Sequence, residues 1–436
     1  MEFAISGHCP GCGAGIEIGG SQRLIACPYC RGRNYLFFQG VPRLVILPKN
    51  ETARSAAETL FIPYWRFTGA FFHWPESVLL HNLLDTSRLA VVLPGLPESL
   101  GLRAQVLPAR FASDIMDGAY CHRDRALCDL IGESSSLSGL VMEMNLPGKL
   151  GEDAVSGPRK NEDNARQKPT AASHSAWIGE TASVVYAPIF RNLGHWFDGV
   201  SGQALSVDDN EISNLPASKG QSGWQPHFLS AFCPNCGGEL QGGGNSLVLH
   251  CPACERLWQQ EAGVWRELPW DILGENPREG HIHLPFWRLE CADKNGEIAG
   301  FADFLTLVLG YNRFGPQPDT GFADMPLSFL IPAWKIAPPI FLRAARLLTI
   351  NQTRLPPTGT GEMMTFSPVT LPPEEAWQAV TPFLVSLNRK KLMEMRLVHQ
   401  AGQLVFVPFE KTATEFIHRG CGFSLPLSLE FQSYAV

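Results

Sequence analysis

The fold of this 436-residue chain is decided by four short stretches that read CPGCG at residues 9–13, CPYCR at 27–31, CPNCG at 233–237 and CPACE at 251–255. In each half of the chain, 14 residues separate the two C-x-x-C pairs, and the second set repeats the first 224 residues later. Four thiolates at this spacing are typical of a tetrahedral metal site. The repeat predicts a duplicated chain with one such site in each half.

The segments around the two cysteine sets, residues 7–38 and 231–260, resemble the zinc-ribbon family. This family is found in general transcription factors and many bacterial proteins. Gly13 and Gly237 follow the second cysteine, where a tight turn can direct backbone N–H groups toward the sulfur atoms. The resemblance implies two structural zinc ions and says little about function. The expected ligands are Cys9, Cys12, Cys27 and Cys30 in the first site and Cys233, Cys236, Cys251 and Cys254 in the second.

Other chemistries of C-x-x-C pairs were compared with the zinc hypothesis. Residues 27–30 match the redox motif of glutaredoxins, but that chemistry needs a helix start, and residues 31–34 (RGRN) are poor helix formers. Iron in a rubredoxin-like site of four thiolates is the alternative metal, although the gap between the pairs is short for that family. Haem attachment is excluded because no histidine directly follows any of the pairs.

Composition and charge limit the class of protein. A chain of 436 residues with 45% hydrophobic and 18% charged residues predicts about two packed domains. The net charge of −7 argues against a surface that clamps nucleic acid along its whole length. We expect a cytoplasmic protein, because the metal spacing explains eight of the 12 cysteines and the first residues lack a signal-peptide pattern. We expect no transmembrane segment, since no apolar run approaches the ~18 residues of a membrane helix.

Proline-marked strand motifs extend the repeat beyond the cysteines. Measured from the first cysteine of each half, the prolines at 63, 108 and 188 lie at offsets 54, 99 and 179, and those at 285, 332 and 408 lie at offsets 52, 99 and 175. Aromatic and branched residues alternate with polar ones around these prolines, a pattern that predicts strands. The agreement favours a tandem duplication of nearly the whole chain, whose halves would pack with pseudo-twofold symmetry.

The predicted fold is α+β and β-rich: two copies of a zinc ribbon, each followed by a small β-barrel or sandwich-like domain with a few helices. The expected segments are ribbon 1 at 1–40, β-domain 1 at 41–200 with a disordered insertion at 149–176, a linker at 201–226, ribbon 2 at 227–262 and β-domain 2 at 263–436. Helices are expected at 51–60, from Pro339 to about residue 348, and from Pro373 until Pro382 bends or ends the last one.

Other candidate sites are weaker. His281 and His283 share one face of a predicted strand, but no acidic cluster accompanies them, so a surface pair is the simpler interpretation. Cys121 and Cys128 could share a helix face and are best explained as buried thiols. No phosphate-binding loop, zinc-protease motif or nucleophile elbow occurs, so no catalytic residue is proposed.

Three functions remain open. The leading hypothesis is a non-catalytic zinc-binding adaptor or scaffold that contacts other proteins through both modules. The second is a nucleic-acid-associated factor, an accessory of replication or transcription, that would contact phosphates through Arg23, Arg31 and Arg33 of the first ribbon. The third is an enzyme of unrecognised class. The protein partner cannot be identified from the sequence.

Overall fold

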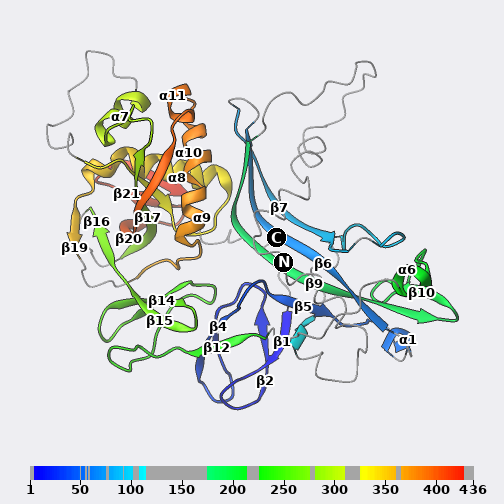
Figure 1. The fold of residues 1–436 in the computed structure, drawn as a ribbon. Helices are drawn as coiled ribbons and strands as arrows, with labels where there is room; N and C mark the ends of the chain where they lie inside the picture. Colours follow the sequence, from blue (N-terminus) through cyan, green and yellow to red (C-terminus); the bar gives the residue numbers. More distant parts are fainter. Residues whose placement is uncertain are drawn as a thin grey trace, which may run out of the picture.

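The computed structural model describes residues 4–49, 51–54, 56, 59–74, 78–91, 93–101, 108–113, 174–213, 225–274, 280–309, 325–359 and 365–426. These residues form four sheets, of nine, three, three and seven strands (Figure 1). The β-rich class is therefore confirmed. The expected barrel is wrong for the described parts of the chain, because the outer strands of the sheets do not pair with one another to close them.

The elements of the first half are β1 (Ala4–His8), β2 (Gly15–Gly19), β3 (Leu24–Ala26), β4 (Arg33–Phe37), β5 (Arg43–Ile46), α1 (Glu51–Arg54), β6 (Thr59–Trp74), β7 (Leu80–Leu89), β8 (Ala109–Phe111), β9 (His174–Asn192), β10 (His195–Asp198), β11 (Ala204–Leu205) and α6 (Asp209–Ser213).

The elements of the second half are β12 (His227–Ser230), β13 (Val248–Cys251), β14 (Arg256–Glu261), β15 (Val264–Leu268), β16 (Trp270–Leu273), β17 (His281–Asp293), α7 (Phe301–Leu309), β18 (Ser328–Pro332), α8 (Pro338–Asn351), the 3-10 helix η4 (Gln352–Arg354), β19 (Pro357–Gly359), α9 (Pro373–Gln378), α10 (Val380–Ser386), α11 (Lys390–Met393), β20 (Leu397–Lys411), β21 (Glu415–His418) and β22 (Phe423–Pro426).

The large sheets of the two halves share one pairing pattern. Strand β9 pairs with β5 in parallel and with β6 and β10 in antiparallel fashion, and β20 pairs in the same senses with β16, β17 and β21. The register also agrees, because Pro63 lies opposite Tyr186 and Pro285 lies opposite Phe406. Each strand from β5 to β11 thus has a counterpart among β16 to β22.

One proline match of the sequence was wrong. Pro332 ends β18, whose counterpart is β7, whereas Pro108 precedes β8. The backbone N–H of Ala333 donates to the carbonyl of Pro285 as that of Ala90 donates to Pro63, so Ala90 is the structural counterpart of Ala333. The equal offset of Pro108 and Pro332 therefore does not reflect an equal place in the fold.

Long strands of the first half reach the core of the second half. The ends of β6 and β9 place Ala70, Phe72, Trp74 and Ile178 in one buried cluster with residues of α8 and α10 (Figure 1). Helix α8 buries residues at helical spacing, among them Phe341, Ala344, Ala345 and Leu348. It confirms the helix expected after Pro339, and α9 begins at Pro373 as expected.

One helix prediction is wrong in part. Helix α1 covers the start of the helix expected at 51–60, but β6 begins at Thr59 and pairs with both β7 and β9. The prediction for Pro382 is confirmed: α9 ends at Gln378, the residue whose carbonyl the proline ring would meet, and a separate helix, α10, begins at Val380.

The two cysteine modules, residues 4–38 and 227–261, share a sheet and a core. Strand β12 of the second module pairs with β4 of the first in antiparallel fashion and completes the sheet β12-β4-β3. Its counterpart β1 pairs instead with β2 and β8, so the expected pseudo-twofold packing is wrong at this contact. The shared core holds Leu24 and Tyr35 from the first module and Ala231, Leu240, Leu249 and Trp258 from the second.

The expected linker and insertion are only partly described. Residues 204–213 of the expected linker form β11 and α6, and Asp209 of α6 pairs with Arg191 and accepts a 2.7 Å hydrogen bond from the Trp196 indole. Residues 214–224 and residues 149–173 of the expected insertion lie outside the described residues, and residues 174–176 begin β9. Within the described segments, no helix has the length and apolarity that a membrane crossing requires.

The shared core predicts that the modules unfold together. Leu240 is fully buried where the two modules meet, so Leu240→Ala should lower the free energy of unfolding by about 2–5 kcal/mol. Leu193→Ala is the control, because Leu193 is 92% exposed and its loss should change stability by less than about 0.5 kcal/mol. Urea unfolding followed by tryptophan fluorescence measures both values. Equal stability of the two variants would contradict the shared core.

Candidate metal centres

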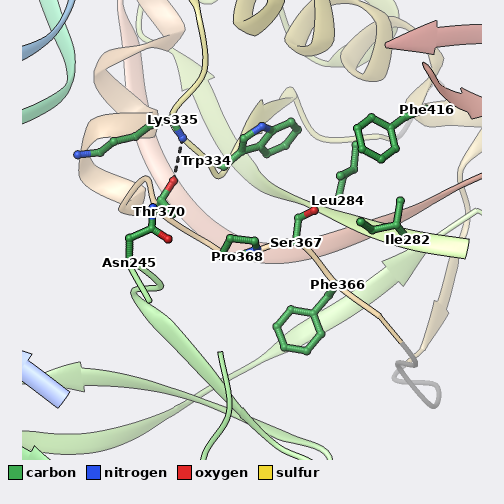
Figure 2. A pocket seen from close by; sticks show the side chains of 10 residues that line it. All are labelled: Asn245, Ile282, Leu284, Trp334, Lys335, Phe366, Ser367, Pro368, Thr370 and Phe416. Atoms are coloured by element: carbon green, nitrogen blue, oxygen red, sulfur yellow. Dashed lines mark hydrogen bonds between the residues drawn. The ribbon is translucent and has the colours of Figure 1, made fainter. Parts of the chain in front are cut away.

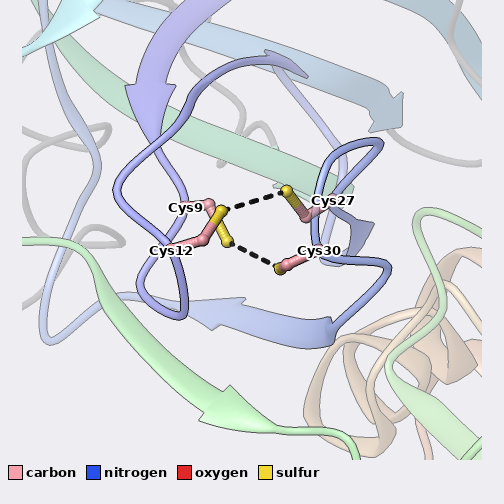
Figure 3. A group of neighbouring side chains, drawn as sticks. All are labelled: Cys9, Cys12, Cys27 and Cys30. Carbon is pink, nitrogen blue, oxygen red and sulfur yellow. Dashed lines mark hydrogen bonds between the residues drawn. The ribbon is translucent and has the colours of Figure 1, made fainter.

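The first centre forms where two hairpins present their turns to each other (Figure 3). The β1–β2 hairpin carries Cys9 and Cys12, and the β3–β4 hairpin carries Cys27 and Cys30. The Sγ atom of Cys9 lies 3.7 Å from that of Cys30, and Cys12 Sγ lies 3.7 Å from Cys27 Sγ. All four Sγ atoms lie within 4.8 Å of one another.

The second centre repeats this arrangement. Cys233 Sγ lies 3.6 Å from Cys254 Sγ, and Cys236 Sγ lies 3.4 Å from Cys251 Sγ. The four sulfur atoms again lie within 4.8 Å of one another. The structure thus brings together all eight cysteines that the sequence analysis named as ligands, as two separate groups.

The sulfur geometry fits a tetrahedral metal ion. A Zn–S distance of about 2.3 Å gives a tetrahedron whose edge is about 3.8 Å. The observed separations of 3.4 to 3.7 Å are close to that edge. Four thiolates complete the coordination of such an ion and leave no position for substrate or water. The two tetrads are therefore suited to hold zinc ions that stabilise the fold.

Each C-x-x-C turn has the same backbone conformation. The residue after the second cysteine has a positive φ in all four turns: +74° at Gly13, +61° at Arg31, +73° at Gly237 and +56° at Glu255. The N–H of that residue donates to the carbonyl of the first cysteine over 2.8 to 2.9 Å. These turns allow successive N–H groups to face the thiolates, which stabilises the negative charge of the sulfur atoms.

The thiols of the first tetrad differ in acidity. The backbone N–H of Cys30 lowers the pKa of Cys27 to about 6. At Cys12 the backbone N–H of Ala14 lowers the pKa, but desolvation and hydrogen bonds with the other cysteines outweigh it and raise the value to about 11. Without a cation, four neighbouring thiols cannot all ionise. A bound metal ion would displace the remaining protons.

The redox alternative lacks the element it needs. The turn that holds Cys27 and Cys30 leads into strand β4 at Arg33, so no helix N-terminus lowers the pKa of these thiols. Both sulfur atoms also face the other pair of cysteines (Figure 3). The geometry favours a metal site over a disulfide-exchange pair.

The three arginines of the nucleic-acid alternative do not gather into one open cluster. The Arg23 guanidinium lies 5.2 Å from the ring centroid of Phe38, and burial lowers its pKa. Arg33 Nε lies 3.3 Å from Glu239 Oε1 of the second module. Arg31 is exposed. Two of the three cations are thus engaged within the protein.

The junction of the modules presents two exposed aromatic rings. The N–H of Ala231 donates to the carbonyl of Arg33 at 3.1 Å, so the turn at 27–32 lies beside the chain that enters the second module. Tyr29 of that turn is 70% exposed, and Phe232 is 56% exposed. The sequence analysis did not single out Phe232. The repeat of 224 residues aligns Phe232 with His8, directly before a metal-site turn. This alignment was the signal in the sequence that could have identified Phe232.

The histidine pair is not the surface pair that the sequence suggested. His283 is fully buried, and its Nδ1 lies 2.9 Å from the carbonyl oxygen of Thr365. Burial lowers its pKa and keeps the ring neutral. Among the described residues, the groups of three or more ligand-type side chains are the two cysteine tetrads. Cys121 and Cys128 lie outside the described residues.

Comparison of the chain with protein-family models, curated proteins and solved structures gives no match.

Removing one ligand from either tetrad should release one of two metal ions. We expect wild-type protein to contain two zinc ions, and Cys12→Ser and Cys236→Ser to contain one each, because three thiolates hold zinc far less tightly than four. Plasma mass spectrometry of the purified proteins counts the metal and separates zinc from iron. Urea unfolding followed by circular dichroism should show that each variant is less stable than wild type, because the module that lost its metal shares a core with the other. Two metal ions in either variant would contradict the assignment.

The strained turn of the second tetrad offers a stabilising substitution. Glu255 adopts a φ of +56°, a conformation that is unfavourable for a residue with a side chain. Glu255→Gly should therefore raise the free energy of unfolding by about 1 kcal/mol. Gly237→Ala, at a φ of +73°, is the opposite test and should lower it by a similar amount. Urea unfolding at fixed zinc concentration measures both, and a loss of stability in Glu255→Gly would refute the argument.

Proposed function

We propose that this protein is a non-catalytic adaptor that binds other proteins through a rigid pair of zinc ribbons. In this proposal the two tetrads hold structural zinc ions, and the large sheets position the ribbons. We also propose that the chain arose by tandem duplication. The proposed domain bounds are those expected from the sequence, except that β-domain 1 extends to residue 213, because β11 and α6 lie in the expected linker.

The junction of the two ribbons is the observation that carries the proposal. Strand pairing between β4 and β12 and the Arg33–Glu239 ion pair fix the two ribbons against each other. Tyr29, in the turn at 27–32, and Phe232, just before a turn of the second module, are both exposed near this junction. Aromatic side chains are enriched in protein interfaces, where they supply much of the binding energy. A fixed junction with exposed rings therefore suits a partner protein.

The chemistry of the site supports binding over catalysis. Four thiolates saturate a tetrahedral ion, so neither tetrad offers the open position that a catalytic zinc site keeps. Nucleic-acid binding loses support because Arg23 packs against Phe38 and Arg33 pairs with Glu239. Phosphate binding depends on several cations that are free to face the backbone.

Affinity purification from the native cells tests this function. We expect the tagged protein to retain a stoichiometric protein partner after nuclease treatment. The variant Tyr29→Ser/Phe232→Ser should lose at least 90% of that partner. Leu193→Ser, which alters an exposed apolar residue on another turn, should keep it. Mass spectrometry quantifies the partner, and zinc content verifies that the ribbons are intact.

Two outcomes would contradict the proposal. Partners that disappear after nuclease, together with co-purified nucleic acid, would favour the nucleic-acid alternative. Equal recovery of partner by the double variant and by wild type would show that the junction is not the binding surface.

A further inference from the structure

A cavity of about 380 Å³ lies in the second half of the protein (Figure 2). One wall is the sheet, which contributes Ile282 and Leu284 from β17 and Phe416 from β21. Trp334 covers another side, in the segment between β18 and α8. Residues 366–370 border the cavity beside β17, with the Phe366 ring turned away toward His250 and Phe406, and Asn245 reaches the cavity from the second cysteine module.

The first half closes the same place in its fold. Leu60 lies opposite Ile189 in the sheet as Ile282 lies opposite Phe409, and Trp196 has the same register position as Phe416. In the first half these counterparts form a continuous buried cluster. Its buried members are Leu60, Ile62, Tyr64, Leu93, Leu96, Ala187, Ile189, Trp196 and Ile212.

The second half has a cavity where the first half has a filled core because different segments cover the two sheets. After Ala90, the chain of the first half places Leu93 and Leu96 over the sheet, and α6 adds Ile212. After the counterpart Ala333, the chain of the second half turns into α8, which begins at Pro338. Helix α8 buries its apolar face in the main core, and none of its residues lines the cavity. The space that leucines fill in one half is thus a cavity in the other.

The lining combines apolar walls with neutral polar groups. Asn245, Ser367 and Thr370 contribute hydrogen-bonding side chains. The Thr370 hydroxyl accepts a 2.9 Å hydrogen bond from the backbone N–H of Lys335, so its own hydrogen can be donated to a ligand. The Lys335 side chain extends away from Leu284 and Trp334 in Figure 2. Lys335 also lines the cavity, but its ammonium group points away, so the polar side chains beside the apolar walls are uncharged.

We propose that this cavity binds a small, neutral aromatic molecule that carries one hydrogen-bonding group. Its volume is near the lower end of the ~300–1,000 Å³ of small-molecule sites, which suits one or two fused rings. The rings pack between Leu284, Trp334 and Phe416, and the polar group meets the Thr370 hydroxyl and the Asn245 side chain, which lie next to each other in Figure 2. This site does not depend on the proposed adaptor function.

The site has a structural link to the junction of the modules. Asn245 directly follows Gly244, whose carbonyl oxygen accepts hydrogen bonds from the backbone N–H groups of Arg23 and Leu24. A ligand that contacts Asn245 thus touches the turn that ties the second module to the first.

Equilibrium dialysis of the full zinc-loaded chain with 2-naphthol and with naphthalene tests the site. We expect saturable binding of both probes at one site per chain. Ser367→Phe should weaken both at least tenfold, because a ring would occupy the cavity. Thr365→Phe adds the same ring two residues away, at an exposed position that does not line the cavity, and should change affinity less than twofold.

Asn245→Ala separates the polar contact from the apolar ones. It should weaken 2-naphthol about two- to tenfold, the loss of one hydrogen bond, and leave naphthalene unchanged. Absence of saturable binding to wild type, or full affinity in a folded Ser367→Phe variant, would overturn the proposal. Should Ser367→Phe fail to fold, Asn245→Ala decides: a selective loss of 2-naphthol supports the site, and unchanged 2-naphthol binding overturns it.

Discussion

The pairing of β12 with β4 is the contact on which the rest of the molecule depends. A cysteine module of about 35 residues is too small to bury a stable core alone, so it needs both a metal and a neighbour. Leu24 and Tyr35 find that neighbour in Leu240 and Leu249 of the other module. The pairing therefore fixes the distance between the two tetrads, exposes the rings at the junction and holds the turn before Asn245.

The two halves show how one pairing pattern supports two different interiors. The strand partners of β9 and β20 agree in order and direction, because those backbone hydrogen bonds require little of the individual side chains. The covering segments differ. In the first half, loop leucines and α6 close the sheet, whereas in the second half α8 to α10 pack against the long strands β6 and β9 of the first.

The sequence predicted which cysteines gather into each tetrad, because the ligand chemistry of a metal site demands cysteines at fixed spacing. It predicted the strands around Pro63 and Pro285, because their aromatic and branched residues favour extended backbone. It could not predict that β12 leaves its own module, since a strand's pairing partner depends on which edge is open and not on its residues. The match of Pro108 with Pro332 failed for a related reason: equal spacing along the chain did not imply an equal place in the sheet.

The order of synthesis follows from the β12–β4 pairing. About 190 residues separate the end of β4 from the start of β12, and a ribosome adds roughly 5–20 residues per second. For roughly 10 to 40 seconds, therefore, the nascent chain carries β4 with one bare edge and with Tyr35 uncovered. Bare edges recruit other strands, so this interval is when the growing chain is most exposed to wrong strand pairing.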